Sequence, residues 1–135
     1  MSNNWKNYWS KKNIWGSSSI WKKNSQVLYT NFKKIASINA KDILDIGCGT
    51  GELIENFIHD ANKIYGVDIS KDYVKTCKLK FKNQNKVTIR LFNNNYNNLY
   101  EMKKKFDFIF CNSVIQYFTN ENEIIELVKA VKKVS

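Results

Sequence analysis

The residues best suited to chemistry form a glycine-rich turn, DIGCGTG, at positions 45–51. Gly47, Gly49 and Gly51 are three of only five glycines in a chain of 135 residues that has no proline. Glycine lets the backbone turn sharply and approach a ligand with no side chain in between. The apolar run before the turn predicts a strand, and the run after it predicts a helix whose unpaired N–H groups point back at the turn. We interpret the turn as a ligand cradle.

The spacing of the glycines and the charges beside them narrow the choice of ligand. The turn reads G-x-G-x-G, whereas a dinucleotide fingerprint reads G-x-G-x-x-G. A P-loop would place Lys and then Ser or Thr after the last glycine, where this chain has Glu52 and Leu53. Two acids, Asp45 and Glu52, flank the turn. This arrangement favours a cationic ligand over an anionic pyrophosphate.

A second acid at a defined distance makes the pattern more specific. The segment LDIGCGTG resembles the first motif of the class I S-adenosylmethionine-dependent methyltransferases, in which an acid and an apolar residue precede G-x-G-x-G. Asp68 ends the next predicted strand, in YGVDIS, 17 residues after Gly51. The family places there the acid that binds both ribose hydroxyls of the cofactor. The resemblance covers about residues 41–134 and implies S-adenosylmethionine as cofactor and S-adenosylhomocysteine as product.

The resemblance also assigns roles to individual residues. It implies that the cofactor is bound by residues of the turn, of the end of the second strand and of the later loops: Asp45, Gly47, Cys48, Gly49, Gly51, Asp68, Ile69, Asn95, Asn112 and Ser113. Within this set, Ile69 would pack on the adenine, and Asn95 would accept a hydrogen bond from its amino group. Residues at the substrate mouth would be Gln116 and Tyr117, with Trp5 and Trp9 as further candidates by position.

The implied reaction leaves the catalytic residue open. The resemblance implies in-line transfer of the sulfonium methyl group to a nucleophile. Because this group is already activated, catalysis can come from holding the acceptor close and aligned, and a base is needed only for an acceptor that must lose a proton. His59, the single histidine, is predicted at the surface, away from the cofactor end of its helix. The sequence contains no recognisable cluster of metal ligands.

The elements that must position these residues alternate between strand and helix from residue 41 onward. Apolar patterning predicts strands at 42–46, 63–68, 87–92 and 106–111. It predicts helices at 51–60 and 71–82, a loop with at most a short helix at 93–105, and a final helix after Asn120. Ser25, Ser70 and Asn120 are the expected N-caps, and the final helix carries apolar residues at helical spacing, at Ile124, Ile125, Leu127, Val128 and Val131. Such alternation builds a parallel α/β sheet from right-handed crossovers.

The family likeness adds the topology. It implies a Rossmann-like three-layer sandwich with strand order 3-2-1-4 that lacks the C-terminal strands of the full methyltransferase fold. The fourth strand would then be an apolar edge, which is prone to pair with another strand. We therefore expect either an N-terminal piece of a longer enzyme or self-association through this edge.

The N-terminal part differs in composition from the rest. Residues 1–40 hold all four tryptophans and seven lysines but no acid, within a chain of net charge +10. We predict a basic, aromatic helical arm over 1–40, with a flexible joint near 16–19, and a cofactor-binding domain over 41–135. Trp5, Tyr8 and Trp9 would share one face of a short helix. The arm could cover the cofactor site as a lid, pack against the sheet, stack on sugars or bases, or lie on a membrane surface.

Composition limits the remaining classes. Cys48, Cys77 and Cys111 are odd in number and show no CxxC spacing, which favours reduced thiols. No signal peptide or transmembrane run is evident, so a cytoplasmic location is expected. Arg90 is the only arginine, which disfavours a dedicated nucleic-acid surface. We predict a methyltransferase acting on a small-molecule or glycan acceptor, with two alternatives: an inactive cofactor-binding module, or a basic protein that binds or modifies RNA or DNA.

Overall fold

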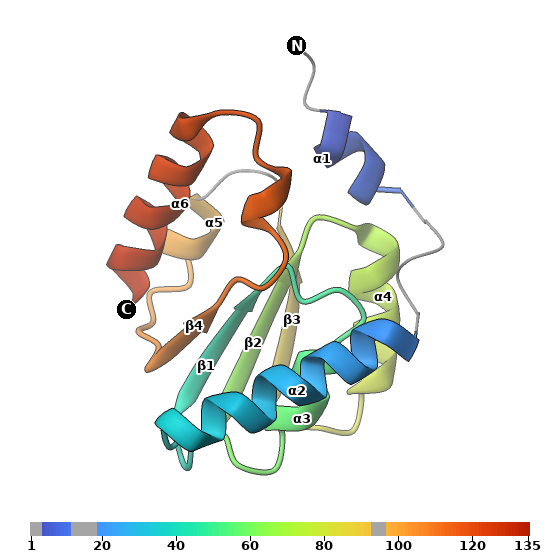
Figure 1. Cartoon of the computed structure of the whole chain (residues 1–135), viewed down its shortest axis with the longest axis vertical. Helices are drawn as coiled ribbons and strands as arrows, with labels where there is room; N and C mark the ends of the chain where they lie inside the picture. The colour runs from blue at the N-terminus through green and yellow to red at the C-terminus, as the bar shows by residue number, and fades with distance from the viewer. Residues whose placement is uncertain (1–3, 12–18, 93–96) are drawn as a thin grey trace.

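A parallel four-stranded sheet forms the centre of the protein. The computed structural model describes residues 4–11, 19–92 and 97–135. Its strands are β1 (Asp42–Ile46), β2 (Lys63–Asp68), β3 (Val87–Leu91) and β4 (Phe108–Phe110). They lie in the order β3-β2-β1-β4, and every neighbouring pair is parallel. Figure 1 shows that all four strands point toward the same edge. The predicted α/β fold and strand order are confirmed.

Helices cover both faces of this sheet and complete three layers (Figure 1). Their bounds are α1 (Asn4–Trp9), α2 (Ser19–Ile35), α3 (Glu52–Phe57), α4 (Lys71–Lys80), α5 (Asn97–Tyr100) and α6 (Glu121–Val134), with a 3-10 turn at Ile115–Tyr117. On one face lie α2, α3 and α4, and on the other lie α5 and α6. The joint expected near 16–19 falls largely on residues outside the described ranges.

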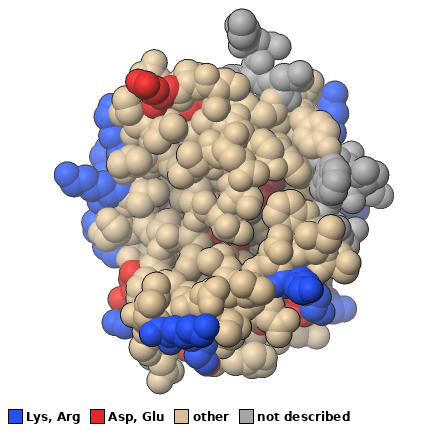
Figure 2. Space-filling view, in the orientation of Figure 1, with Lys and Arg blue, Asp and Glu red and all other residues tan. Residues whose placement is uncertain are grey.

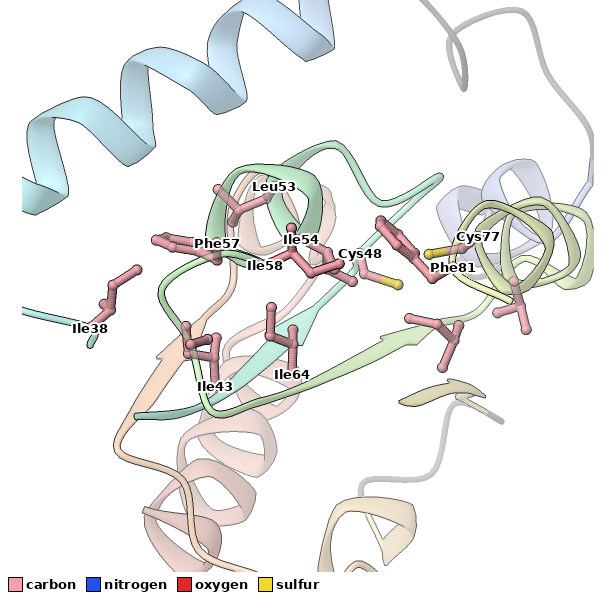
Figure 3. Packing of buried hydrophobic residues seen from close by; sticks show 13 residues of the cluster. Ile38, Ile43, Cys48, Leu53, Ile54, Phe57, Ile58, Ile64, Cys77 and Phe81 are labelled. Carbon is pink, nitrogen blue, oxygen red and sulfur yellow. The ribbon is translucent and has the colours of Figure 1, made fainter. Parts of the chain in front are cut away.

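Two apolar cores hold the layers together. Successive residues of a strand point to opposite faces, so Ile43 enters one core and Leu44 the other, and both are fully buried. Figure 3 shows the first core, in which Ile54 and Phe57 of α3 pack toward Ile43 and Ile64 of the sheet. The second core joins the sheet to the buried side of α6. Burial of β1 on both faces fixes the position from which the glycine turn leaves the sheet.

Local hydrogen bonds begin two of the helices as predicted. Ser70 Oγ accepts the N–H of Tyr73 at 3.3 Å and caps α4. Asn120 Oδ1 accepts the N–H of Glu123 at 3.1 Å and caps α6. The prediction that Ser25 caps a helix is wrong. Helix α2 begins at Ser19 instead, because nothing between that residue and Ser25 breaks a helix, and Ser25 is buried within it.

Only one stripe of α6 faces the sheet. Leu127, which the spacing singled out, is buried, whereas Ile124, Ile125 and Val128 are 37%, 46% and 58% exposed. The spacing indicates an apolar helix, but the sheet contacts only the stripe that contains Leu127. The strand predicted at 106–111 is also shorter, because the N–H of Phe106 donates to the carbonyl of Val134 at the end of α6 rather than to a strand.

The start of α3 lies very close to α4. Gly51 precedes α3 with a φ of +87°, in the region that favours glycine. A Cβ atom at Gly51 would stand 2.5 Å from Cε2 of Phe81 and 2.8 Å from Sγ of Cys77. A Cβ atom at Gly49, with a φ of +55°, would have no neighbour nearer than 4.0 Å. The close approach of the two helices therefore depends on Gly51.

We predict that Gly51→Ala destabilises the protein more than Gly49→Ala does, because only Gly51→Ala adds crowding of side chains to backbone strain. Both alanines would adopt a left-handed conformation, at a cost of about 1–2 kcal/mol. Only Gly51→Ala also crowds the helix pair, which adds about 1–3 kcal/mol. Urea denaturation of both variants should therefore show a clearly larger loss of unfolding free energy for Gly51→Ala. Equal losses would contradict the packing role of Gly51.

Candidate functional site

A cavity opens at the carboxyl ends of the strands, where parallel α/β sheets usually bind ligands. Its walls come from the glycine turn, the end of β2, the loop after β4, and helices α1 and α2. The space inside the cavity and its open mouth amounts to about 1170 Å³, part of which is continuous with bulk solvent.

The glycine turn is fixed to the neighbouring strand by its backbone. The N–H groups of Gly47 and Cys48 both donate to the carbonyl of Val67, at 2.8 and 3.1 Å. A Cβ atom at Gly47 would come within 2.3 Å of Cγ2 of Val114, so the loop after β4 lies directly against the turn. Gly49 lines the cavity and has open space where a side chain would be. Gly47, which is exposed, and Gly49 therefore both give a ligand access to the backbone of the turn.

The Asp68 carboxylate connects this turn to the end of β2. One oxygen accepts the N–H of Gly49 and the other accepts the N–H of Ser70, each at 2.8 Å. Burial raises the pKa of Asp68, although these backbone N–H groups partly offset the effect. Each carboxylate oxygen can accept a further hydrogen bond, and Asp68 lines the cavity. The same side chain can therefore hold the turn and contact a ligand.

Asp45 is an almost fully buried acid that lines the cavity. Burial raises the pKa of Asp45 to about 7, and the nearby carboxylates of Asp68 and Glu52 contribute to the increase. Glu52 accepts a hydrogen bond from the Thr50 hydroxyl and lies 3.6 Å from the ammonium of Lys80. Three carboxylates thus converge on the turn. A positive group in the cavity would favour their charged forms.

Aromatic side chains form part of the cavity wall. Trp5 of α1 contacts Phe118, with ring centroids 5.4 Å apart, and Trp9 contacts Tyr117 at 5.2 Å. Tyr117 and Phe118 belong to the loop after β4, more than 100 residues later in the chain. We call these four residues, Trp5, Trp9, Tyr117 and Phe118, the aromatic wall. Figure 1 shows α1 beside this loop, above the strand ends.

An ion pair joins α1 to the body of the protein. Lys6 Nζ lies 2.9 Å from the carboxylate of Glu123, and both side chains are largely buried. Partial burial opposes ionisation of Glu123, but Lys6 and the N–H of Thr119 together hold its pKa below the usual value. The accepting carboxylate belongs to the first turn of α6, so α1 is anchored on the same element that packs against the sheet.

Most of the residues predicted for the site do meet at this cavity. The following predicted residues line it: Asp45, Gly47, Cys48, Gly49, Asp68, Ile69, Asn112, Ser113, Tyr117, Trp5 and Trp9. Gly51 instead packs against α4, and Gln116 is exposed and lies outside the lining. Asn95 falls outside the described residues. His59 is exposed in the turn that follows α3, as predicted.

The structure adds lining residues that local patterns did not single out. Val114 reaches the turn because Ser113 adopts a φ of +59°, which is uncommon for residues other than glycine and redirects the chain after β4. Tyr73 of α4 and Phe118 also line the cavity. In the sequence, Tyr73 and Phe118 are recognisable only as aromatic residues near the N-caps Ser70 and Asn120. Their position at the cavity depends on how α1 and α4 lie against the loop after β4.

Metal-ligand groups, membrane-spanning helices and the cysteines bear on the alternatives. Among the described residues, no three His, Cys, Asp or Glu side chains are arranged to hold a metal ion. In the same part of the chain, no helix has both the length and the apolar character needed to cross a membrane. The cysteines are free thiols, with Cys48 and Cys77 buried and Cys111 half-buried.

Comparison with known families identifies the group to which the protein is related. A family model described as a methyltransferase domain matches residues 43–134, which include the turn, Asp68 and α6. The chain belongs to this methyltransferase domain family. The match begins within β1 and ends with α6.

Individual relatives support this family. A protein of Geobacillus sp. (strain WCH70), named "Putative methyltransferase", is 37% identical over 94 residues, covering 68% of this chain and 37% of the relative. The structure of an S-adenosylmethionine-dependent methyltransferase from Clostridium acetobutylicum ATCC 824 is 25% identical, with a TM-score of 0.64 over 98% of this chain and 52% of the other.

A more distant structure shares the fold. Magnesium protoporphyrin IX methyltransferase from Synechocystis PCC 6803, solved with bound S-adenosylmethionine, is 16% identical, with a TM-score of 0.69 over 98% of this chain and 65% of the other. The chain spans about two fifths of the length of the curated relatives it matches.

We predict that Asp45 makes the stability of the ligand-free protein fall as pH rises. Below about pH 4 its carboxyl is neutral in both the folded and the unfolded state. Between pH 4 and 7 only the unfolded state ionises, because the folded pKa is about 7, and stability therefore declines. The full loss, reached above pH 7, is of order 4 kcal/mol. Asp45→Asn cannot ionise and should lack this decline.

Urea denaturation of the wild type and of Asp45→Asn from pH 4 to 8.5 measures this difference. The unfolding free energy of Asp45→Asn relative to the wild type should increase with pH. The control is Asp72→Asn, which removes an exposed carboxyl from the first turn of α4 and should follow the wild-type profile. Parallel profiles for the wild type and Asp45→Asn would contradict the perturbed titration of Asp45.

Proposed function

We propose that this chain binds S-adenosylmethionine and acts as the cofactor-binding part of a methyltransferase. One observation carries the proposal: the Asp68 carboxylate and the open Gly49 backbone stand side by side at the cavity, joined by a 2.8 Å hydrogen bond. In a member of the methyltransferase domain family, this pairing puts an acceptor for hydroxyl groups next to an accessible turn. Asp68 and Gly49 are thus part of the proposed cofactor site.

The residues present suit each part of this cofactor. The remaining lone pairs of Asp68 can accept hydrogen bonds from two neighbouring ribose hydroxyls. Ile69, half-buried and next along the chain, offers an apolar surface to the adenine. The carboxylates of Asp45 and Glu52 supply negative charge near the turn, which favours a ligand that carries an ammonium and a sulfonium. Asn112 and Ser113 would lie beside the methionine part, and Asn95, which is outside the described residues, would accept a hydrogen bond from the adenine amino group.

When bound, the cofactor supplies a methyl group on positively charged sulfur, which an acceptor lone pair takes as the carbon–sulfur bond breaks and S-adenosylhomocysteine is released. The contribution of this chain is to position the reactants and to exclude water. Cavity walls of apolar and aromatic side chains limit solvent at the point of transfer. No described residue is assigned as a base.

The proposal extends to the acceptor and to the organisation of the chain. We propose a small-molecule or glycan acceptor that enters at the cavity mouth, where Tyr117, Trp5 and Trp9 lie. Residues 1–40 would act as the arm that closes this side, and residues 41–135 as the cofactor-binding unit. A cytoplasmic location and pairing through the β4 edge stay predictions.

We expect calorimetric titration with S-adenosylmethionine and S-adenosylhomocysteine to show binding by the wild type. Asp68→Ala should weaken binding by about 100-fold, because it removes a charged acceptor of two hydrogen bonds. Asp68→Asn retains one carbonyl oxygen as an acceptor, and its affinity for both ligands should fall by about tenfold. Asp72→Ala, the control, removes an exposed acid from the neighbouring helix and should bind like the wild type.

Because Asp68 also holds the glycine turn, the variants need a folding measurement without ligand. Circular dichroism and urea denaturation identify conditions under which each variant is folded, and titrations are compared only there. No heat from the wild type at high micromolar ligand would overturn the proposal. Wild-type affinity in a folded Asp68→Ala would overturn the role of Asp68. Binding without turnover on any acceptor would support an inactive cofactor-binding module instead.

A further inference from the structure

The aromatic wall lines the same cavity as the carboxylates of Asp45, Glu52 and Asp68. We propose that this wall receives the methyl acceptor, and that the acceptor is an uncharged small molecule with a flat aromatic ring. The inference rests on the proposed function, because it assumes that the glycine turn and Asp68 hold the cofactor.

Ring geometry is the first argument. Trp9 meets Tyr117 at an interplanar angle of 63° and Tyr73 at 55°, with centroids 5.2 and 6.5 Å apart. The ring of Tyr8 also contacts Trp9, at 5.1 Å and 90°, so each of the three partners is edge to face or tilted and none is stacked parallel on the indole. Trp9 and Tyr117 are both half-buried and line the cavity. Flat aromatic surfaces of this kind bind other flat rings through offset or edge contacts.

Charge is the second argument. Lys6 is the one cation among the described lining residues, and it is already paired with Glu123 at 2.9 Å. The other charged lining residues are the carboxylates of Asp45, Glu52 and Asp68. Figure 2 shows uncharged side chains across the middle of this face, with acidic side chains visible in its hollow. A phosphate or carboxylate would lose its hydration here without gaining a free cation, which disfavours anionic acceptors despite the net charge of +10.

The cofactor sets the third limit. A cationic acceptor would meet the positive sulfonium at short range, which costs free energy in a cavity shielded from water. A sugar would need several hydrogen-bonding partners for its hydroxyls. Beside the wall, the polar lining residues of the loop after β4 are Asn112 and Ser113, whereas the wall itself is made of rings. An uncharged aromatic ring satisfies all three conditions.

Calorimetry on protein saturated with S-adenosylhomocysteine tests this inference with three probes: 2-naphthol, 2-naphthyl phosphate and methyl β-glucoside. We expect 2-naphthol to bind at least about tenfold more tightly than either of the others. Trp9→Leu and Tyr117→Leu should each lower the affinity for 2-naphthol by about tenfold. The control is Tyr100→Leu, which removes an aromatic ring from α5, outside the lining and away from Trp9, and should change 2-naphthol affinity less than about threefold.

S-adenosylhomocysteine affinity is measured for every variant before any probe is added. A failure of the wild type at that stage overturns the proposed function. With that binding intact, three results overturn the present inference alone: tighter binding of the phosphate or the glucoside, full 2-naphthol affinity in Trp9→Leu and Tyr117→Leu, or 2-naphthol binding that occurs only in protein without S-adenosylhomocysteine. The last result would mean that the ring occupies the nucleoside part of the cavity rather than the aromatic wall.

Discussion

The carboxylate of Asp68 is the group on which the geometry of the site depends. It accepts backbone N–H groups from the glycine turn after β1 and from the start of α4, so one side chain joins three segments at the carboxyl edge of the sheet. A buried carboxylate is costly unless it is hydrogen-bonded, and these two bonds meet that need. Because the same carboxylate borders the cavity, any change in it affects the scaffold and the ligand site together.

The glycines of the turn serve different physical needs. Gly51 allows α3 to approach α4, Gly47 allows Val114 to lie against the turn, and Gly49 leaves the backbone open toward the cavity. The three glycines therefore allow close packing at Gly47 and Gly51 and give access to the backbone at Gly47 and Gly49. Side chains from the loop after β4 complete the site, which places the ligand cradle between segments that are far apart in the sequence.

Local electrostatics in this protein differ from its overall charge. The chain carries a net charge of +10, yet the cavity is bordered by Asp45, Glu52 and Asp68, and its lysine is paired with Glu123. Lysines of the chain lie mainly on exposed surfaces, where they are solvated. The charge of a binding site is set by the few ionised groups that share a desolvated cavity. The net charge of the whole chain was therefore a weak guide to the charge of the ligand.

The sequence by itself determined the strands at 42–46 and 63–68, the caps at Ser70 and Asn120, and the spacing of the turn to Asp68. Each of these depends on apolar periodicity or on hydrogen bonds between residues a few positions apart. Tertiary structure alone decided which stripe of α6 is buried, that the Ser25 side chain is buried, and how Trp9 meets Tyr117. It also decided that burial raises the pKa of Asp45. These features depend on contacts between distant segments, whose free energies appear only when the layers are packed together.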